Sequence, residues 1–307
     1  MENRKKIKVM KLGGAFFDSE IIKNFSIFEK KGKRLYVVSA LKGITRILDV
    51  IFMISIQKDI DVDLIEDSIK NFLERFKQKH LILIDGLFKE EKEDILRDFS
   101  ILFDELKNVI QNNRPKINAE KYLYDQYYSS ILKFGELSSS KILYHYLLSI
   151  GVKNTYFDAR DYVLTSSEYR EAKIISIDPS FENLFEENQV LVTQGFIGKS
   201  ITGKDTVIGF DGSDKSAAQF AVALSEKNEV ELTFFKDVPG VYKGNPKKES
   251  NLELFISMTI SGYLLLVEET GSFVVRPDSI SCLANKNILI KICSYLDLEA
   301  PGTVIKD

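Results

Sequence analysis

Apolar runs rich in β-branched residues alternate along this chain with amphipathic segments, and this pattern restricts its fold more than any other feature. Strand-like runs lie at 7–12, 34–40, 152–159, 189–197, 206–210, 230–235 and 288–293. Helical periodicity appears at 19–30, 43–55, 119–150, 213–226 and 253–270. Strands separated by helices predict a mainly parallel sheet that is covered by helices on both faces. The pattern therefore predicts an α/β fold, a three-layer sandwich around a central sheet.

The region 57–118 differs from the rest of the chain in composition, because it is long, charged and almost free of glycine and proline. It predicts two or three amphipathic helices that form an insertion or lid. The alternation of strand-like and helical segments becomes less regular near 185–205. This change suggests an N-terminal lobe of about 1–190 and a C-terminal lobe of about 191–307. The chain has no internal repeat and no low-complexity linker, so we expect residues 1–307 to form a single domain.

The charge balance and the scarce reactive residues exclude several classes of function. Forty-five acidic and 42 basic residues give a formal charge of −3, which provides no basic field for nucleic acid. No apolar run is long enough for a bilayer, and the N-terminus lacks a signal peptide, so we expect a cytoplasmic protein. Cys282 and Cys293 are expected to be reduced and structural. His80 and His145 lie far apart in the sequence, which argues against a zinc site or a serine-histidine-aspartate triad.

Glycine and other small residues recur at the predicted strand-to-helix turns, together with Lys11 in the first turn. These turns are 11–14, 39–45, 158–160, 194–198, 209–214 and 236–240. In parallel sheets, ligands bind beyond the carboxyl ends of the strands. Glycine permits close backbone approach, helix N-termini supply N–H groups, and lysine supplies positive charge. Together the turns suit a polyanion such as a nucleoside triphosphate, although each alone is ordinary turn chemistry and no Walker A loop occurs.

Several short motifs in a fixed order make the pattern specific. They are KLGG (11–14), VVSALKGIT (37–45), FGELSSSKIL (134–143), DARDYVLT (158–165), VTQGFIG (192–198), GSDKSAA (212–218), KDVPGVY (236–242) and PGTVI (301–305). This order resembles the aspartokinases of the amino acid kinase superfamily over about residues 7–305. The resemblance implies the amino acid kinase fold, with an N-terminal substrate lobe and a C-terminal nucleotide lobe.

The resemblance also implies a reaction, the ATP-dependent phosphorylation of the side-chain carboxylate of L-aspartate to 4-phospho-L-aspartate. A carboxylate is already a nucleophile at neutral pH, so this chemistry needs no general base. Positioning and charge stabilisation by lysine, backbone N–H groups and Mg²⁺ would suffice. The implied small-molecule partners are ATP and the amino acid, and no protein ligand to a metal is predicted.

The family's functional positions can be carried over residue by residue. The implied catalytic residues are Lys11, which stabilises the transferring phosphoryl group, and Asp214, which orients Lys11. The implied substrate-binding residues are Ser39, Thr45, Glu136, Phe210 and Ser213, with Glu136 receiving the substrate ammonium group. The implied nucleotide-binding residues are Lys11, Gly13, Gly14, Lys236, Asp237, Tyr242 and Lys247.

The sequence departs from the family pattern inside the expected site. Phe210 replaces an arginine that grips a substrate carboxylate, and Asp211 replaces a glycine. Phe273 replaces a lysine near the nucleotide, and Arg276 stands where histidine is usual. Lys236 replaces a threonine and is predicted to return positive charge to the phosphates. These departures leave two alternatives open: a kinase for a different amino or carboxylic acid, and a non-catalytic nucleotide-binding protein.

The motif order also bears on regulation. The resemblance places a pair of small regulatory domains after the catalytic domain, whereas this sequence stops at Asp307, directly after PGTVI. We therefore expect no feedback inhibition through such domains. Any self-association, such as a homodimer, is expected to use the kinase domain itself.

Overall fold

The computed structural model describes residues 4–29, 31–58, 60–90, 92–113, 119–209, 211–244 and 251–307. Two of the predicted site residues, Phe210 and Lys247, lie outside these described residues.

A mainly parallel sheet forms the centre of the molecule, with strand order β12-β14-β13-β9-β1-β2-β6-β3. Only the β13–β14 pair in it is antiparallel among the described residues. The strands of the described residues are β1 (Lys6–Leu12), β2 (Lys33–Val38), β3 (Thr155–Tyr156), β4 (Val163–Thr165), β5 (Ile174–Ile177), β6 (Val190–Gln194), β7 (Ile197–Ser200), β8 (Asp205–Val207), β9 (Glu229–Lys236), β10 (Val241–Tyr242), β11 (Leu254–Phe255), β12 (Ser257–Thr259), β13 (Leu289–Ser294) and β14 (Thr303–Lys306). The predicted α/β class and parallel sheet are confirmed.

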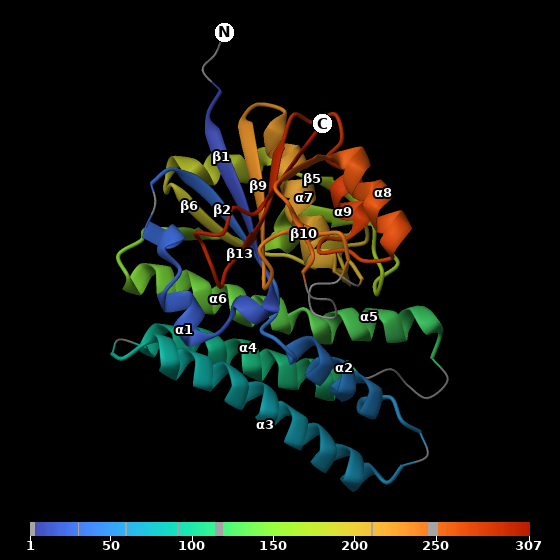
Figure 1. Cartoon of the computed structure of the whole chain (residues 1–307). Coiled ribbons are helices and arrows are strands. Elements are labelled where there is room, and N and C mark those ends of the chain that lie inside the picture. The colour runs from blue at the N-terminus through green and yellow to red at the C-terminus, as the bar shows by residue number, and fades with distance from the viewer. Residues whose placement is uncertain are drawn as a thin grey trace.

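Helices cover both faces of this sheet. The α-helices are α1 (Ser19–Lys23), α2 (Ile44–Ser55), α3 (Val62–Leu87), α4 (Glu93–Asn112), α5 (Lys121–Leu132), α6 (Phe134–Ser149), α7 (Gly212–Ser225), α8 (Ile260–Thr270) and α9 (Pro277–Ser281). Figure 1 shows α2 to α6 gathered on one side of the sheet and α7 to α9 on the other. Helix α6 packs against β2, β3 and β6, whereas α7 packs against β1, β2 and β9. The sheet therefore forms the middle of three layers.

The region that was predicted to be a helical insertion contains the two long helices α3 and α4. Figure 1 shows them as the outermost layer, on the far side of α5 and α6 from the sheet. Their contact is aromatic: the rings of Phe76 and Phe99 stack with centroids 6.2 Å apart. His80 is fully buried beside them, and burial lowers its pKa to about 4. A neutral imidazole suits this apolar site, and among the described residues His80 belongs to no group of side chains that could hold a metal ion.

A smaller sheet, with strand order β5-β4-β7-β8, leads the chain into α7. The predicted single strand at 189–197 is wrong in detail, because it breaks into β6 and β7 at Gly195-Phe196. A Cβ atom on Gly195 would lie only 2.7 Å from Cα of Ser213 in the first turn of α7. The chain bends here to make room for that turn, and Phe196 adopts a left-handed φ of 66°.

Other predicted boundaries also differ from the structure. The predicted helix 119–150 consists of α5 and α6, which meet at Lys133. The predicted helix 253–270 begins only at Ile260, because the Thr259 hydroxyl caps it by accepting a hydrogen bond from the Gly262 N–H. The residues before this cap pair as strands instead, with Ser257 opposite Val304 of β14. Sheet pairing thus overrides the local helical periodicity.

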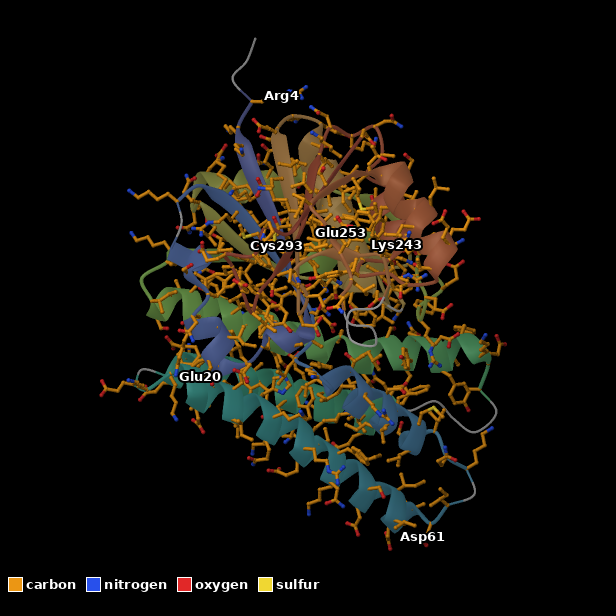
Figure 2. All side chains as sticks on the ribbon, viewed as in Figure 1. Arg4, Glu20, Asp61, Lys243, Glu253 and Cys293 are labelled. Atoms are coloured by element: carbon orange, nitrogen blue, oxygen red, sulfur yellow. The ribbon has the colours of Figure 1, made fainter. Side chains whose placement is uncertain are left out.

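Charged side chains cover the outside of the molecule. Figure 2 shows Arg4, Glu20 and Asp61 at its periphery, whereas Cys293 lies over the sheet. Both cysteines, Cys282 and Cys293, are free thiols. Within the described part of the chain, no helix has the length and apolar character that a bilayer crossing requires.

Candidate active site

The candidate site lies at the carboxyl ends of β1, β2 and β9. Strand β1 is central in the sheet, where β2 lies on one side of it and β9 lies on the other. Such a switch point leaves a crevice beyond the strand ends. A cavity of about 950 Å³ opens here. It is lined by Lys11, Gly14, Ala15, Ser39, Ala40, Leu41, Lys42, Gly43, Thr45, Tyr128, Glu136, Arg170, Glu171, Phe196, Gly209, Asp211, Gly212 and Ser213.

A buried cluster of two lysines and one aspartate lies where the carboxyl ends of β1 and β9 meet the start of α7. The Nζ atom of Lys11 on β1 lies 2.7 Å from Oδ1 of Asp214 on α7. The Lys236 ammonium, at the end of β9, donates to Oδ2 of the same carboxylate at 2.8 Å. Lys11 and Asp214 are 7% and 1% exposed. With two cations and one anion, the cluster has a net positive charge.

The electrostatics of the cluster follow from burial and from this charge excess. Burial opposes ionisation of Asp214, but the charges and hydrogen bonds of Lys11 and Lys236 hold its pKa below the usual range. Burial lowers the pKa of Lys236, and the nearby charge of Lys11 lowers it further. A bound anion would relieve the repulsion between the two ammonium groups. The cluster is therefore suited to an anionic ligand, such as a phosphate group.

The first turn of α7 forms one wall of the cavity, with Gly212 and Ser213 among the lining residues. Asp211, just before the helix, adopts a left-handed φ of 55°. A Cβ atom on Gly212 would lie 2.9 Å from Cβ of Ile208 and 3.0 Å from the ring of Phe196. Close packing thus requires glycine at the start of α7. The helix dipole gives this wall a partial positive charge.

Glu136, in the first turn of α6, is a buried carboxyl group that lines the same cavity. Its Oε1 accepts a hydrogen bond from the Ala40 N–H at 3.1 Å, whereas Oε2 has no hydrogen-bond partner among the described residues. The side chain is 3% exposed, and this burial raises the pKa of Glu136 to about 8. A buried oxygen without a partner is costly. The site therefore offers a receptor for a cationic or hydrogen-bond-donating group.

The two glycines after Lys11 approach their neighbours closely. A Cβ atom on Gly14 would lie 2.4 Å from the carbonyl oxygen of Ala40, a clash that excludes any side chain without a backbone shift. A Cβ atom on Gly13 would lie 3.5 Å from Nζ of Lys11, so the backbone passes directly beside the ammonium group. The Lys42 N–H donates to the Gly14 carbonyl, which joins this turn to the loop after β2.

The predicted site residues divide into three groups. Those that line the cavity are Lys11, Gly14, Ser39, Thr45, Glu136 and Ser213. Asp214 is joined to them through its ion pair with Lys11, and Lys236 forms an ion pair with the same Asp214 carboxylate. Gly13, Asp237 and Tyr242 do not line it: Gly13 lies beside Lys11, and after β9 the chain turns away, with Tyr242 pairing in β10 with Leu254 of β11. Phe210 and Lys247 are outside the described residues. The roles assigned to all of these residues stay predictions.

Sequence reasoning missed Arg170 and Tyr128, which also line the cavity. Arg170 lies on the loop between β4 and β5, and Tyr128 lies on α5. Neither belongs to a motif, and their proximity depends on how the small sheet packs against α5. No local sequence signal marks them.

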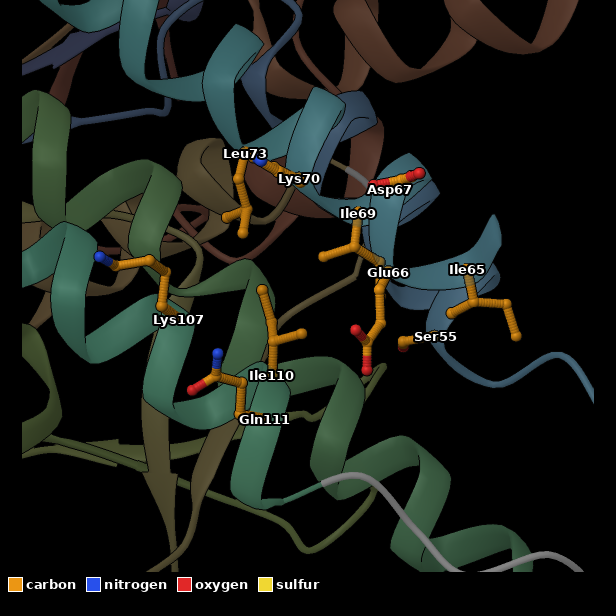
Figure 3. Close-up of a pocket in the computed structure, with 10 residues that line it drawn as sticks. All are labelled: Ser55, Ile65, Glu66, Asp67, Ile69, Lys70, Leu73, Lys107, Ile110 and Gln111. Carbon is orange, nitrogen blue, oxygen red and sulfur yellow. The ribbon is translucent and has the colours of Figure 1, made fainter. Parts of the chain in front are cut away.

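A second cavity, of about 680 Å³, lies among the outer helices and is separate from this site. Figure 3 shows its lining, with the apolar side chains of Ile69, Leu73 and Ile110 beside the charged Glu66 and Lys107. None of the predicted site residues lines it.

The fold and the site together define a class of protein. The family model described as the amino acid kinase family matches residues 6–292, and the chain therefore belongs to the amino acid kinase family.

Curated proteins with similar sequences include aspartokinases. The chain is 24% identical over 302 residues to an aspartokinase of Chlamydia muridarum, covering 97% of this chain and 63% of that protein. It is 25% identical over 319 residues to the lysine-sensitive aspartokinase 3 of Escherichia coli, covering 97% and 64%. It is 27% identical over 308 residues to a bifunctional aspartokinase/homoserine dehydrogenase 1 of Arabidopsis thaliana, covering 97% and 32%. The chain thus spans about a third to two thirds of these relatives.

Solved structures share the fold. Aspartokinase III of E. coli in complex with aspartate and ADP matches with a TM-score of 0.78 at 23% identity, covering 98% of this chain and 65% of that one. Aspartate kinase of Clostridium acetobutylicum matches with a TM-score of 0.71 at 19% identity, covering 97% and 63%. The predicted amino acid kinase fold is confirmed.

Proposed function

We propose that this protein transfers the γ-phosphoryl group of ATP to the side-chain carboxylate of an amino acid, with L-aspartate as the first candidate. The product would be 4-phospho-L-aspartate. The observation that carries the proposal is Glu136, which lines the same cavity as Lys11 and whose buried Oε2 has no hydrogen-bond partner among the described residues. The site therefore provides a receptor for an ammonium group and a cation for a phosphate within one enclosed space.

Each part of the site has a task in this reaction. The acceptor carboxylate attacks the γ-phosphorus, and the bond from that phosphorus to the bridging oxygen of ADP breaks. Lys11 stabilises the charge on the phosphoryl oxygens, while Asp214 keeps the ammonium in place across 2.7 Å. The dipole of α7, whose first turn lines the cavity, favours the same anions. Because the nucleophile is already ionised, no residue has to remove a proton.

Magnesium would accompany ATP and neutralise its β- and γ-phosphates. The described residues contain no group of three or more histidine, cysteine, aspartate or glutamate side chains that could hold a metal ion. Asp214 is already engaged by Lys11 and Lys236. A magnesium ion at this site would therefore depend on the phosphates and water for most of its ligands.

Likeness to the relatives supports aspartate as the first candidate. The names of the curated relatives include aspartokinases, and the matched E. coli structure holds aspartate and ADP. The match spans nearly all of this chain and includes Lys11, Glu136 and Asp214.

A second candidate function is the phosphorylation of a different amino or carboxylic acid. Two acidic side chains besides Glu136, namely Asp211 and Glu171, line the cavity, and residue 210 is phenylalanine where the resemblance places an arginine. Burial raises the pKa of Asp211, and the nearby charge of Asp214 raises it further. Extra acidic groups repel a dicarboxylate unless another cation balances them.

Trapping the acyl phosphate tests both candidates. The protein is incubated with Mg-ATP, hydroxylamine and a panel containing L-aspartate, L-glutamate and amine-bearing monocarboxylic acids, and hydroxamate formation is measured. Hydroxamate with L-aspartate supports the first candidate, and a clear preference for another acid supports the second. ATP binding by calorimetry without hydroxamate from any acid would instead favour a non-catalytic nucleotide-binding protein.

A further inference from the structure

Arg170 is the arginine that lines the candidate substrate cavity. It lies on the loop between β4 and β5, which no motif identified as part of the site. The position at which the resemblance implies a carboxylate-binding arginine is occupied by Phe210. The cavity therefore contains an arginine, but it comes from a different element of the fold.

The contacts of Arg170 hold its guanidinium group in place and leave donors for a ligand. The guanidinium carbon lies 4.1 Å from the centre of the Tyr128 ring, a stacked cation–π contact. The nearest approach to the Asp49 carboxylate is 3.9 Å, which is longer than a hydrogen bond. The Arg170 side chain is 45% exposed. An arginine carries several N–H donors in a planar fork, and the contacts with Tyr128 and with the distant Asp49 carboxylate leave some of them for a ligand.

The charges around the cavity indicate what those donors bind. Lys11 is neutralised in part by Asp214, and Glu136 offers a carboxyl oxygen as a receptor for an ammonium group. Asp211 and Glu171 add further negative charge. A substrate with a second carboxylate needs a cation other than Lys11, and the cavity lining supplies Lys42, a point charge, and Arg170, a planar fork. Because guanidinium binds carboxylate through two parallel hydrogen bonds, Arg170 matches that group in charge and in geometry.

We propose that Arg170 binds the carboxylate of the substrate that is not phosphorylated, in place of the arginine that is missing at position 210. The substrate is accordingly an amino acid with two carboxylates. This inference rests on the proposed function and extends it to a specificity-determining residue. Tyr128 acts as a positioning residue, since its ring supports the guanidinium plane.

Paired substrates and paired variants test the inference. The assays use whichever of L-aspartate and L-glutamate the wild-type protein phosphorylates better, together with the α-amide of that acid. The amide keeps the ammonium group and the acceptor carboxylate but lacks the second carboxylate. The variants are Arg170→Gln, Arg170→Lys and the control Arg97→Gln, whose side chain is 66% exposed on α4. KM and kcat are measured for both substrates, and ATP affinity is measured by calorimetry.

Arg170→Gln is expected to raise KM for the dicarboxylate by roughly 10- to 100-fold, the loss typical of a charge-assisted contact. The KM for the α-amide, the ATP affinity and the kcat are expected to stay within about 3-fold, because a contact outside the reacting groups contributes mainly uniform binding. Arg170→Lys is expected to fall between the wild type and Arg170→Gln, since it keeps the charge and loses the fork. Arg97→Gln should behave as wild type.

The possible failures are distinguishable. An active wild type whose preference for the dicarboxylate over the α-amide survives in Arg170→Gln would overturn the role of Arg170 and leave the proposed function intact. An equal loss on both substrates, with weakened ATP binding, would show a structural role instead and also overturn it. A wild type that phosphorylates no acid would overturn the proposed function, and this inference with it.

Discussion

The ammonium of Lys11 and the carboxylate of Asp214 lie 2.7 Å apart, although one belongs to the first strand and the other to helix α7. The two elements meet because β9, which follows α7, is inserted beside β1 in the sheet. The register places Lys11 opposite Phe234, two residues before Lys236, so the second lysine reaches the same carboxylate. Sheet topology thus builds the charged cluster.

Replacement of Lys11 tests its role in charge stabilisation. Lys11→Ala is expected to lower kcat by about 100-fold or more, because an enclosed cation aimed at the developing charge acts in the transition state. Lys8→Ala is the matched control: Lys8 lies on the same strand, and its side chain is 39% exposed and paired with Glu231. Steady-state rates of both variants are compared. An activity loss of equal size in Lys8→Ala, or none in Lys11→Ala, would contradict the assignment.

Lys236 is expected to contribute to nucleotide affinity. Its pKa is lowered by burial and then by Lys11, so an added anion nearby stabilises its charged form. Lys236→Ala should weaken ATP binding by about 10-fold, the loss of roughly one charge-assisted contact. Calorimetry with ATP measures this, and Lys227→Ala, an exposed lysine beyond the end of α7, serves as control. Unchanged affinity in Lys236→Ala refutes the prediction.

The titration of Glu136 should control substrate binding. Its pKa is raised to about 8 by burial, so the free protein holds this carboxyl neutral below that pH. Because only the ionised form attracts an ammonium group, kcat/KM for the amino acid should rise with pH up to about pH 8. The Glu136→Gln variant should lose this rise and bind the amino acid weakly. An identical pH profile in both proteins would be evidence against the receptor role.

The same group predicts a stability change with pH. Glu136 binds a proton more tightly in the folded state, where its pKa is about 8, than in the unfolded chain, where it is near 4.5. Between these values the folded state carries more protons, so the contribution of Glu136 to stability is present at low pH and is lost as the pH rises through this window. Denaturant unfolding of the wild type and Glu136→Gln at pH 5 and pH 8 measures the difference. The wild type should lose more stability than the variant over that interval.

The two glycines after Lys11 form a matched pair for a packing test. Gly14→Ala places a Cβ atom 2.4 Å from the Ala40 carbonyl oxygen, and we expect it to lower the free energy of unfolding by about 1–3 kcal/mol, as overpacking does. Gly13→Ala meets only an ordinary contact of 3.5 Å and should be tolerated. Chemical denaturation of both variants decides the matter. Equal stability of the two variants would contradict this prediction, because it would mean that the loop after β2 shifts to accommodate the added Cβ atom.

Much of this site was predictable because its parts occupy strand ends. Lys11 and Asp214 flank turns that the topology of a parallel sheet brings to one edge, and the motif order located both. Glu136 was also found through its motif, although its burial and its unpartnered oxygen became visible only in the structure.

The rest depended on packing between distant elements. Arg170 reaches the cavity because β4 joins the small sheet through β7, a long-range pairing that leaves no local pattern in the sequence. The break at Gly195 has the same origin, since it is the first turn of α7 that requires the bend. Periodicity describes the faces of single elements and carries no information on which elements become neighbours.

A crystal structure with a non-hydrolysable ATP analogue, Mg²⁺ and L-aspartate tests the central claim most directly. We predict that Nζ of Lys11 lies within hydrogen-bond distance of a γ-phosphate oxygen while Oε2 of Glu136 accepts from the amino group of aspartate, with the side-chain carboxylate in line with the γ-phosphorus. A nucleotide bound away from Lys11, or an amino acid that leaves Glu136 without contact, would contradict the account.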